Sequence, residues 1–297
     1  MKHLLFIILT SLILSSCEKD FNTPLSGTKM SISSFFSDTS VVTVVVSKSY
    51  PLANNNTAGI SDASIELYED SVFKEILHHV SSGSTSGTYK SNLIPQRGRN
   101  YSITVTEPVY GKATAQDNIP LPATINSCQL LQYVDSGNYG IATVDLNFTD
   151  NPSVPNYYSI SMTEKAVSFY LDTAGDTILY THNFFVHPSA LTKLQDSVFD
   201  YSSDAILFSD NGFNGQQKQV ILNCDAYTNT SNILHATLYI NLNTISKSYY
   251  EYFRTLALLA NTNQSATYTS VNIYGNIQNG YGIFAGQSAQ SVQVHIK

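Results

Sequence analysis

The chain has 297 residues, of which 42% are hydrophobic and only 12% are charged, and it contains 20 Tyr and 14 Phe. This is the composition of a folded chain long enough for two domains, and it excludes disorder as the main state. The net charge is −7, and Arg97, Arg99 and Arg254 are the only guanidinium donors, so we expect no binding to a nucleic-acid phosphate backbone.

The first residues have the pattern of a secretion signal. A basic start precedes an apolar run, Leu4–Leu14, which is much shorter than the roughly 20 residues that a helix needs to cross a bilayer. Leu14–Cys17 resembles the bacterial lipobox, in which the cysteine is acylated and cleavage occurs just before it. We therefore expect a signal peptide over residues 1–16, a fatty-acylated Cys17, and a lipidated tether over residues 17–27.

The charged residues that follow Cys17 bear on location. Lys19 and Asp20 resemble the surface-export signal of Bacteroidota lipoproteins. This resemblance implies a lipid-anchored protein of the outer membrane that faces the cell exterior. A solvated tether on a protein that faces the periplasm explains the same residues, so both orientations stay open.

The body of the chain reads as short antiparallel strands. Val41–Val46 and Ile65–Tyr68 are rich in β-branched or aromatic residues and are bounded by turn formers. Thr143–Phe148 and Ile233–Asn243 alternate apolar and polar residues, and Leu234 begins the apolar series of the latter. This period of two predicts mainly β structure with one wet face on each sheet.

Two domains are expected, joined near residue 120. In residues 28–119, a glycine turn before Tyr89 and the spacing of Gly98 and Tyr101 resemble an immunoglobulin-like or carboxypeptidase-regulatory-like β-sandwich. The proline-rich Ile119–Pro122 suits a stiff connector to a second, β-rich domain over residues 120–297. The fold class predicted is therefore two antiparallel β-sandwich-like domains.

One amphipathic helix is predicted within the second domain. From Ser246 to Ala260, apolar side chains recur at helical spacing, with Tyr249 and Phe253 on the same face. Ser246 is a candidate N-cap, and Asn261 lies near the expected end.

Three motifs in the second domain resemble, in order, the Bacteroidota lipoprotein family called domain of unknown function 4249. They are residues 208–215, 246–253 and 276–284. Gln278 and Asn279 depart from the Glu-Gly that the family commonly has before its glycine-rich turn. The resemblance implies an envelope lipoprotein with no established activity or ligand, often encoded near TonB-dependent receptors, and therefore an accessory role in uptake.

Glycines close the third motif. Gly280, Gly282 and Gly286 can supply positive φ or close backbone approach around Ile283 and Phe284, which predicts a tight structural turn. No phosphate-binding glycine pattern occurs, and no cofactor is expected.

Metal and catalytic patterns are weak. Asp210, Asn211 and Asn214 offer oxygen ligands as in a calcium loop, but the twelfth position is Ile221 in place of the bidentate Glu. A turn with Asn and Gly in left-handed conformations explains the same residues. Ser84 and Ser86 flank Thr85 where a nucleophile elbow would need its serine, so we expect no enzyme.

Two modifications remain candidates in the mature chain. Cys128 and Cys224 are the thiols left after acylation, and they either pair in an oxidising compartment or serve as buried small hydrophobes. Asp-Ser/Thr-aliphatic triplets resemble the sites at which Bacteroidota O-glycosylate exported proteins. The acceptor residues would be Ser71, Thr173, Thr177 and Ser197.

The sequence leads to three functional hypotheses. The first is a non-enzymatic outer-membrane lipoprotein that binds a partner or small ligand, with a TonB-dependent receptor as the expected partner and Tyr-rich faces as contact area. The second is a structural or adhesive envelope protein that recognises glycan or matrix. The third, a glycan-active enzyme, needs two facing carboxylates in one cleft.

Overall fold

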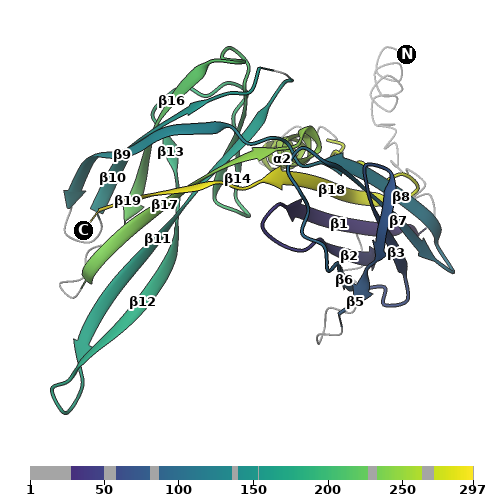
Figure 1. The fold of residues 1–297 in the computed structure, drawn as a ribbon, viewed down its shortest axis with the longest axis horizontal. Coiled ribbons are helices and arrows are strands. Elements are labelled where there is room, and N and C mark those ends of the chain that lie inside the picture. The colour runs from purple at the N-terminus through teal and green to yellow at the C-terminus, as the bar shows by residue number, and fades with distance from the viewer. Residues whose placement is uncertain are drawn as a thin grey trace, which may run out of the picture.

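The computed structural model describes residues 28–49, 58–80, 87–135, 140–152, 154–226, 233–262 and 271–296. Within them the chain is mainly β, with one helix, as predicted (Figure 1). One sheet of eleven strands runs through the molecule, and two smaller sheets of four strands pack against its two halves. The predicted signal peptide, Cys17 and the tether lie outside the described residues.

The first sandwich packs the small sheet β4-β3-β7-β8 against the β18-β1-β2-β6-β5 half of the large sheet. Its strands bury alternate side chains because successive residues point to opposite faces. On β7, Tyr101, Ile103 and Val105 are buried in the core, while Ser102 and Thr104 face outward. The strands are β1 (Met30–Ser37), β2 (Thr43–Lys48), β3 (Ser64–Glu69), β4 (Val72–Ile76), β5 (His78–His79), β6 (Thr88–Lys90), β7 (Asn100–Glu107), β8 (Gly111–Asn118) and β18 (Tyr281–Ser288).

The second sandwich packs the sheet β13-β16-β10-β9 against the β14-β15-β11-β17 half of the large sheet, with β12 paired to β11 and β19 paired to β17. The predicted apolar face of β10 is confirmed, since Val144, Leu146 and Phe148 are all fully buried. The strands are β9 (Thr124–Asp135), β10 (Gly140–Thr149), β11 (Tyr157–Leu171), β12 (Thr177–Val186), β13 (Ser189–Ala190), β14 (Val198–Asp200), β15 (Ala205–Ser209), β16 (Gln217–Ala226), β17 (Ile233–Ile245) and β19 (Ser291–His295).

β17 departs from its predicted alternation at one end. Leu234 is 42% exposed, whereas Ala236 and Leu238 are buried as expected. The register with β11 shifts between Val167 and Ser168, so the strand carries a bulge there. A bulge reverses the facing of the residues beyond it, which turns Leu234 outward and Ile233 into the core.

The expected division into residues 28–119 and 120–297 needs a correction, because the second part completes the first sandwich. β18 lies parallel to β1, from Ser31 opposite Tyr281 to Ser37 opposite Gln287. Ile277 and Phe284 are buried in the core of the first sandwich. β18 also pairs with β17, so the large sheet is continuous between the two sandwiches (Figure 1).

The connector near residue 120 passes directly between the two cores. Ile119 is fully buried in the first core, and Ala123 is buried in the second. The backbone N–H of Ala123 donates to Thr244 Oγ1 on β17 over 3.1 Å. The connector is therefore packed into both sandwiches and leaves little freedom between them.

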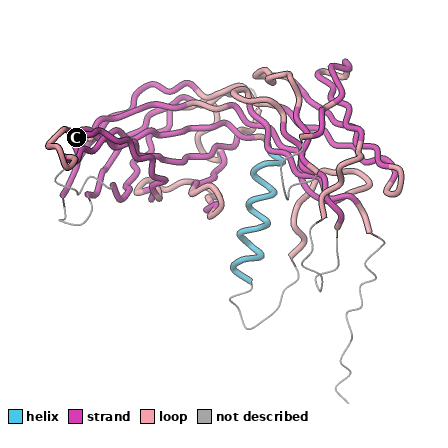
Figure 2. Tube along the Cα trace, turned by 90° about the horizontal axis from the view of Figure 1, so that it is seen from below, coloured by secondary structure: helices cyan, strands magenta, loops and turns pink. Residues whose placement is uncertain are grey.

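The predicted helix is confirmed as α2 (Lys247–Thr262). Ser246 caps it, because its Oγ accepts a hydrogen bond of 3.1 Å from the backbone N–H of Tyr249. Tyr249 and Tyr250 pack with Ile283 and Ala285 of β18 in a third, smaller core. Only this first part of α2 lies against the sheet, and the rest projects away from it (Figure 2).

Candidate functional site

The candidate site is an open groove on the outer face of the small sheet of the first sandwich. Its floor consists of side chains that alternate with the buried ones on β3, β7 and β8. The floor residues are Tyr68, Ser102, Thr104, Thr114 and Gln116. The same period of two that builds the core thus places a row of hydroxyl and amide groups on the opposite face.

One wall of the groove is the segment that leads into β18. Thr114 and Gln278 exchange backbone hydrogen bonds of 3.2 and 2.8 Å, which attach this segment to β8. The Asn276 amide donates to the Phe284 carbonyl over 2.8 Å, and its oxygen accepts from the Phe284 N–H over 2.9 Å. Through these two hydrogen bonds, Asn276 fixes the wall to β18.

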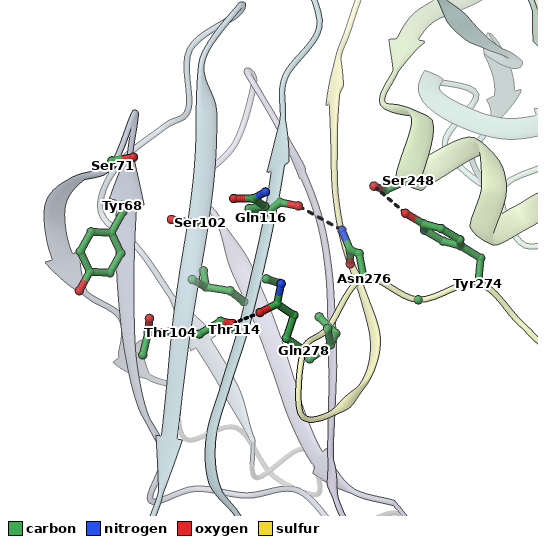
Figure 3. Close-up of a pocket in the computed structure, with 14 residues that line it drawn as sticks. Tyr68, Ser71, Ser102, Thr104, Thr114, Gln116, Ser248, Tyr274, Asn276 and Gln278 are labelled. Carbon is green, nitrogen blue, oxygen red and sulfur yellow. Dashed lines mark hydrogen bonds between the residues drawn. The ribbon is translucent and has the colours of Figure 1, made fainter.

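The groove has a volume of about 740 Å³, within the roughly 300–1,000 Å³ typical of ligand pockets. Figure 3 shows Tyr68 at one end, Ser248 and Tyr274 at the other, and Gln116, Asn276 and Gln278 between them. Of the described residues that line it, none is charged. Its chemistry is that of neutral hydrogen-bond donors and acceptors with two aromatic rings.

A second hollow continues from the groove toward the junction of the sandwiches. It shares Ser71, Ser102 and Gln116 with the groove and adds Asp70 and Asp117. The Asp70 carboxylate is paired with the Arg99 guanidinium over 2.8 Å. This end of the surface therefore carries carboxylates, whereas the groove carries none.

Asp117 joins three separate segments. Its Oδ2 accepts hydrogen bonds from the Ser246 hydroxyl and, over 3.0 Å, from the backbone N–H of Gly286. Burial raises the pKa of Asp117 to about 6, and these hydrogen bonds only partly oppose the shift. One carboxylate thus links β8, the start of α2 and β18.

The first two family motifs meet beside α2. Tyr250 of the motif over residues 246–253 stacks on Tyr157 with ring centroids 4.8 Å apart, and its hydroxyl donates to the Asp196 carbonyl over 2.5 Å. Phe208 and Phe213 of the motif over residues 208–215 are buried in the second core. Packing in the second core accounts for the first motif, and packing of α2 on the large sheet accounts for the second.

The third motif contains a turn at Asn279 and Gly280, whereas Ile283 and Phe284, around which the turn was predicted, lie in a strand. Residues 281–288 are β18, and Gly282 has φ of +106°, a conformation that L side chains rarely adopt. A Cβ atom at Gly282 would lie 2.0 Å from the Ile32 carbonyl oxygen, and one at Gly286 would lie 2.3 Å from the Asn118 carbonyl oxygen. The predicted close backbone approach is therefore present, against β1 at Gly282 and against β8 at Gly286.

The calcium candidates Asp210, Asn211 and Asn214 lie in one loop and line the same hollow. Asp210 is buried, and its Oδ2 accepts a hydrogen bond of 2.8 Å from the Asn156 N–H. The Asn211 amide donates to Asp196 over 3.2 Å, while Asn214 is exposed. No group of three or more His, Cys, Asp or Glu side chains within the described ranges could hold a metal ion. Turn geometry, with Gly212 and Gly215 at positive φ, accounts for this loop.

The candidate disulfide is not formed, because Cys128 and Cys224 are free. Cys128 lies opposite Leu146 on one side of β10, and Cys224 lies opposite Ala142 on the other side. Two strand spacings of about 4.8 Å and four residues of about 3.4 Å each separate them, well beyond the reach of about 7 Å for a disulfide. Burial raises the pKa of both thiols, to about 11 for Cys128 and about 12 for Cys224.

The four candidate O-glycosylation residues are all exposed. Thr173 and Thr177 lie at the tip of the β11–β12 hairpin, and Ser197 lies just before β14. Ser71 occupies the β3–β4 turn with φ of +68° and borders the groove. Their exposure is compatible with modification, which stays a prediction.

Sequence reasoning missed the groove. Ser102, Thr104, Thr114 and Gln116 belong to no motif, and each looks like an ordinary outward strand residue. The available signal was the absence of Lys and Glu from these outward positions, since exposed strand faces commonly carry charge. The pairing of the wall with β8 could not be found in this way, because Thr114 and Gln278 are far apart in sequence.

The fold and groove define the chain as a protein of two β-sandwiches that share one sheet, with a ligand-sized surface groove. Residues 18–293 match the family described as Domain of unknown function (DUF4249), and the chain belongs to that family. No curated protein is recognisably similar in sequence. Among the described residues, no helix has both the length and the apolar character needed to span a membrane.

Three solved structures show weak likeness, each at 8% identity. A membrane anchored protein from Corynebacterium diphtheriae gives a TM-score of 0.21, with 74% of this chain and 55% of that chain covered. A biofilm associated protein (BSP domain) gives 0.19, with 89% and 59% covered. The collagen adhesin of S. aureus gives 0.21, with 90% and 93% covered.

Proposed function

We propose that this protein is a non-enzymatic lipoprotein of the outer membrane, exposed to the cell exterior, that binds a ligand as an accessory to a TonB-dependent uptake system. The observation that carries the proposal is the groove, an open surface lined by neutral hydrogen-bonding groups and walled by the segment before β18. Membership of the family supports the envelope setting. The lipobox resemblance at Leu14–Cys17 supports the anchor.

The anchor is tested by metabolic labelling of cells with a clickable palmitate. The wild-type chain is expected to take up the label, and Cys17→Ser is expected to take up none and to leave the membrane fraction. Protease treatment of intact cells then reports orientation, since an exterior-facing protein is cleaved before the outer membrane is broken. A wild-type band without label would contradict the anchor.

A receptor partner is supported by the β11–β12 hairpin. Leu171, Leu179 and Phe185 are 62%, 59% and 73% exposed. Among the described strands β12 pairs with β11 alone, so its other edge is open to a strand of a partner. Affinity purification from detergent-solubilised membranes is expected to recover a transporter with the wild-type chain. Less of it is expected with Leu179→Lys/Phe185→Lys. Repeated recovery of no transporter would contradict the uptake role.

The second candidate is an adhesive envelope protein that recognises glycan or matrix. It is favoured by the same neutral groove, because a surface-attached glycan and a soluble one present the same groups. Deletion of the gene separates the two functions. Slower growth on a nutrient supports uptake, whereas loss of adhesion with normal growth supports the adhesive role.

A further inference from the structure

We infer that the groove binds a neutral carbohydrate, an inference that rests on the proposed ligand-binding function and names the class of ligand. Several side chains that line the groove are available to bind a ligand. Ser71, Ser102, Thr104 and Gln116 make no side-chain hydrogen bond with any described residue. Hydroxyl and amide groups both donate and accept, so this row offers a ligand both kinds of partner at neighbouring positions.

The wall of the groove is held in place by hydrogen bonds to β8 and α2. Thr114 Oγ1 donates to Gln278 Oε1 over 3.3 Å, and the Tyr274 backbone N–H donates to Thr255 Oγ1 over 2.9 Å. The wall is thus held against β8 and α2 before any ligand arrives. A preformed wall beside unpartnered floor groups reduces the entropy cost of binding.

A tyrosine ring lies at each end of the groove. The Tyr68 ring is held edge-on to Phe73 with centroids 5.7 Å apart, and its hydroxyl donates to Glu66 Oε2 over 2.6 Å. The Tyr274 hydroxyl lies 3.4 Å from Ser248 Oγ at the opposite end. Both rings line the groove beside polar groups, and this combination suits a sugar ring, which has C–H faces and hydroxyl edges (Figure 3).

The charges around the groove argue against an ionic ligand. Among the described residues, no Lys or Arg side chain lines the groove or the adjoining hollow, so an anion finds no cationic partner there. The hollow holds the carboxylates of Asp70 and Asp117. Both are already engaged, by Arg99 and by Ser246, so a cation finds no free pair. A polyhydroxyl ligand without charge matches this polar, uncharged lining, because its hydroxyl groups can pair with the hydroxyl and amide groups of the floor.

The inference is tested by calorimetric titration of the full mature chain, unmodified at Ser71, with neutral maltose-, cellobiose- and chitin-derived oligosaccharides. At least one series is expected to bind. The double variant Ser102→Ala/Gln116→Leu removes two unpartnered groups at nearly constant shape and is expected to weaken binding about tenfold or more. Thr106→Val, on the same face of β7 but outside the groove, is expected to bind as the wild type does.

Two results would overturn the inference. One is the failure of every neutral oligosaccharide to bind a chain whose thermal unfolding is normal, and the other is equal binding by the double variant. If either result is found and a transporter is still recovered, the uptake role is supported and only the assignment of a carbohydrate ligand is wrong. Groove-dependent binding of an oligosaccharide without transporter recovery supports the ligand class and removes the uptake role.

Discussion

Asp117 is the residue on which the joint between the two sandwiches most depends. Its Oδ2 accepts from both Ser246 and Gly286, so a single oxygen connects the helix cap to β18. Burial raises its pKa to about 6, which means that the folded protein holds a proton there more tightly than the unfolded chain does. Protonation of this group therefore stabilises the fold.

The sign of this effect predicts a pH dependence. As the pH rises from the ordinary pKa of 3.8 to about 6, the contribution of Asp117 to the free energy of unfolding falls, and it is constant above that range. The fall amounts to about 3 kcal/mol at about 1.4 kcal/mol per pH unit. Asp117→Asn keeps an oxygen for both hydrogen bonds and does not titrate, so it is expected to lack this fall.

Urea denaturation of both proteins at several pH values between 4 and 7 measures this difference. The variant is expected to gain stability relative to the wild type as the pH rises through this window. Carboxylates such as Glu75, whose pKa is lowered, act in the opposite direction but are common to both proteins. Parallel pH profiles for the two proteins would contradict the role of Asp117.

At the scale of elements, the spacing of apolar residues correctly predicted the strands and the helix whose form depends on neighbouring residues in the sequence. The alternation in β10 and the helical spacing after Ser246 hold in the structure because each element buries one face. Leu234 is exposed and not buried as predicted, because β17 has a bulge there. The position of that bulge depends on the pairing with β11, which the sequence of β17 alone does not reveal. Ile283 and Phe284 lie in a strand and not in the predicted turn, because Gly282 allows close pairing with β1, which lies far away in the sequence.

That pairing predicts a severe effect at Gly282. A Cβ atom there would lie 2.0 Å from the Ile32 carbonyl oxygen, and φ is +106°. Gly282→Ala is therefore expected to lower the free energy of unfolding by about 3 kcal/mol or more, since both strain and a backbone clash oppose folding.

Gly175 in the β11–β12 hairpin is the matched control. Its φ is +86°, but an added Cβ would meet nothing within 4 Å. Gly175→Ala is expected to cost only the conformational strain, about 1 kcal/mol. Chemical denaturation of both variants measures the difference, and equal losses of stability would contradict the close approach of β18 to β1.

For the whole molecule, the shared sheet makes the two sandwiches one folding unit. Ile277 and Phe284 complete the first core, and β18 supplies the neighbour of β1. The connector is also buried at both ends, at Ile119 and Ala123. These contacts depend on residues far apart in sequence, which explains why the chain looked divisible near residue 120.

This architecture predicts the behaviour of fragments. Residues 28–119 alone expose the apolar surface that Ile277 and Phe284 cover and are expected to remain unfolded by circular dichroism. The same fragment joined by a flexible linker to residues 271–288 regains that cover and is expected to form β structure. Cooperative folding of residues 28–119 by themselves would contradict the account of the shared sheet.

The groove also depends on the whole molecule, because its floor comes from the first sandwich and its wall from the segment that leads into β18. Its ligand class is tested most directly by photocrosslinking the full mature chain with a diazirine-bearing neutral oligosaccharide and mapping the labelled peptides by mass spectrometry. The account predicts labels on residues 68–71, 102–104, 114–116 and 274–278, competed by the unmodified oligosaccharide. Competed labels confined to other parts of the chain, such as the β11–β12 hairpin, would contradict it.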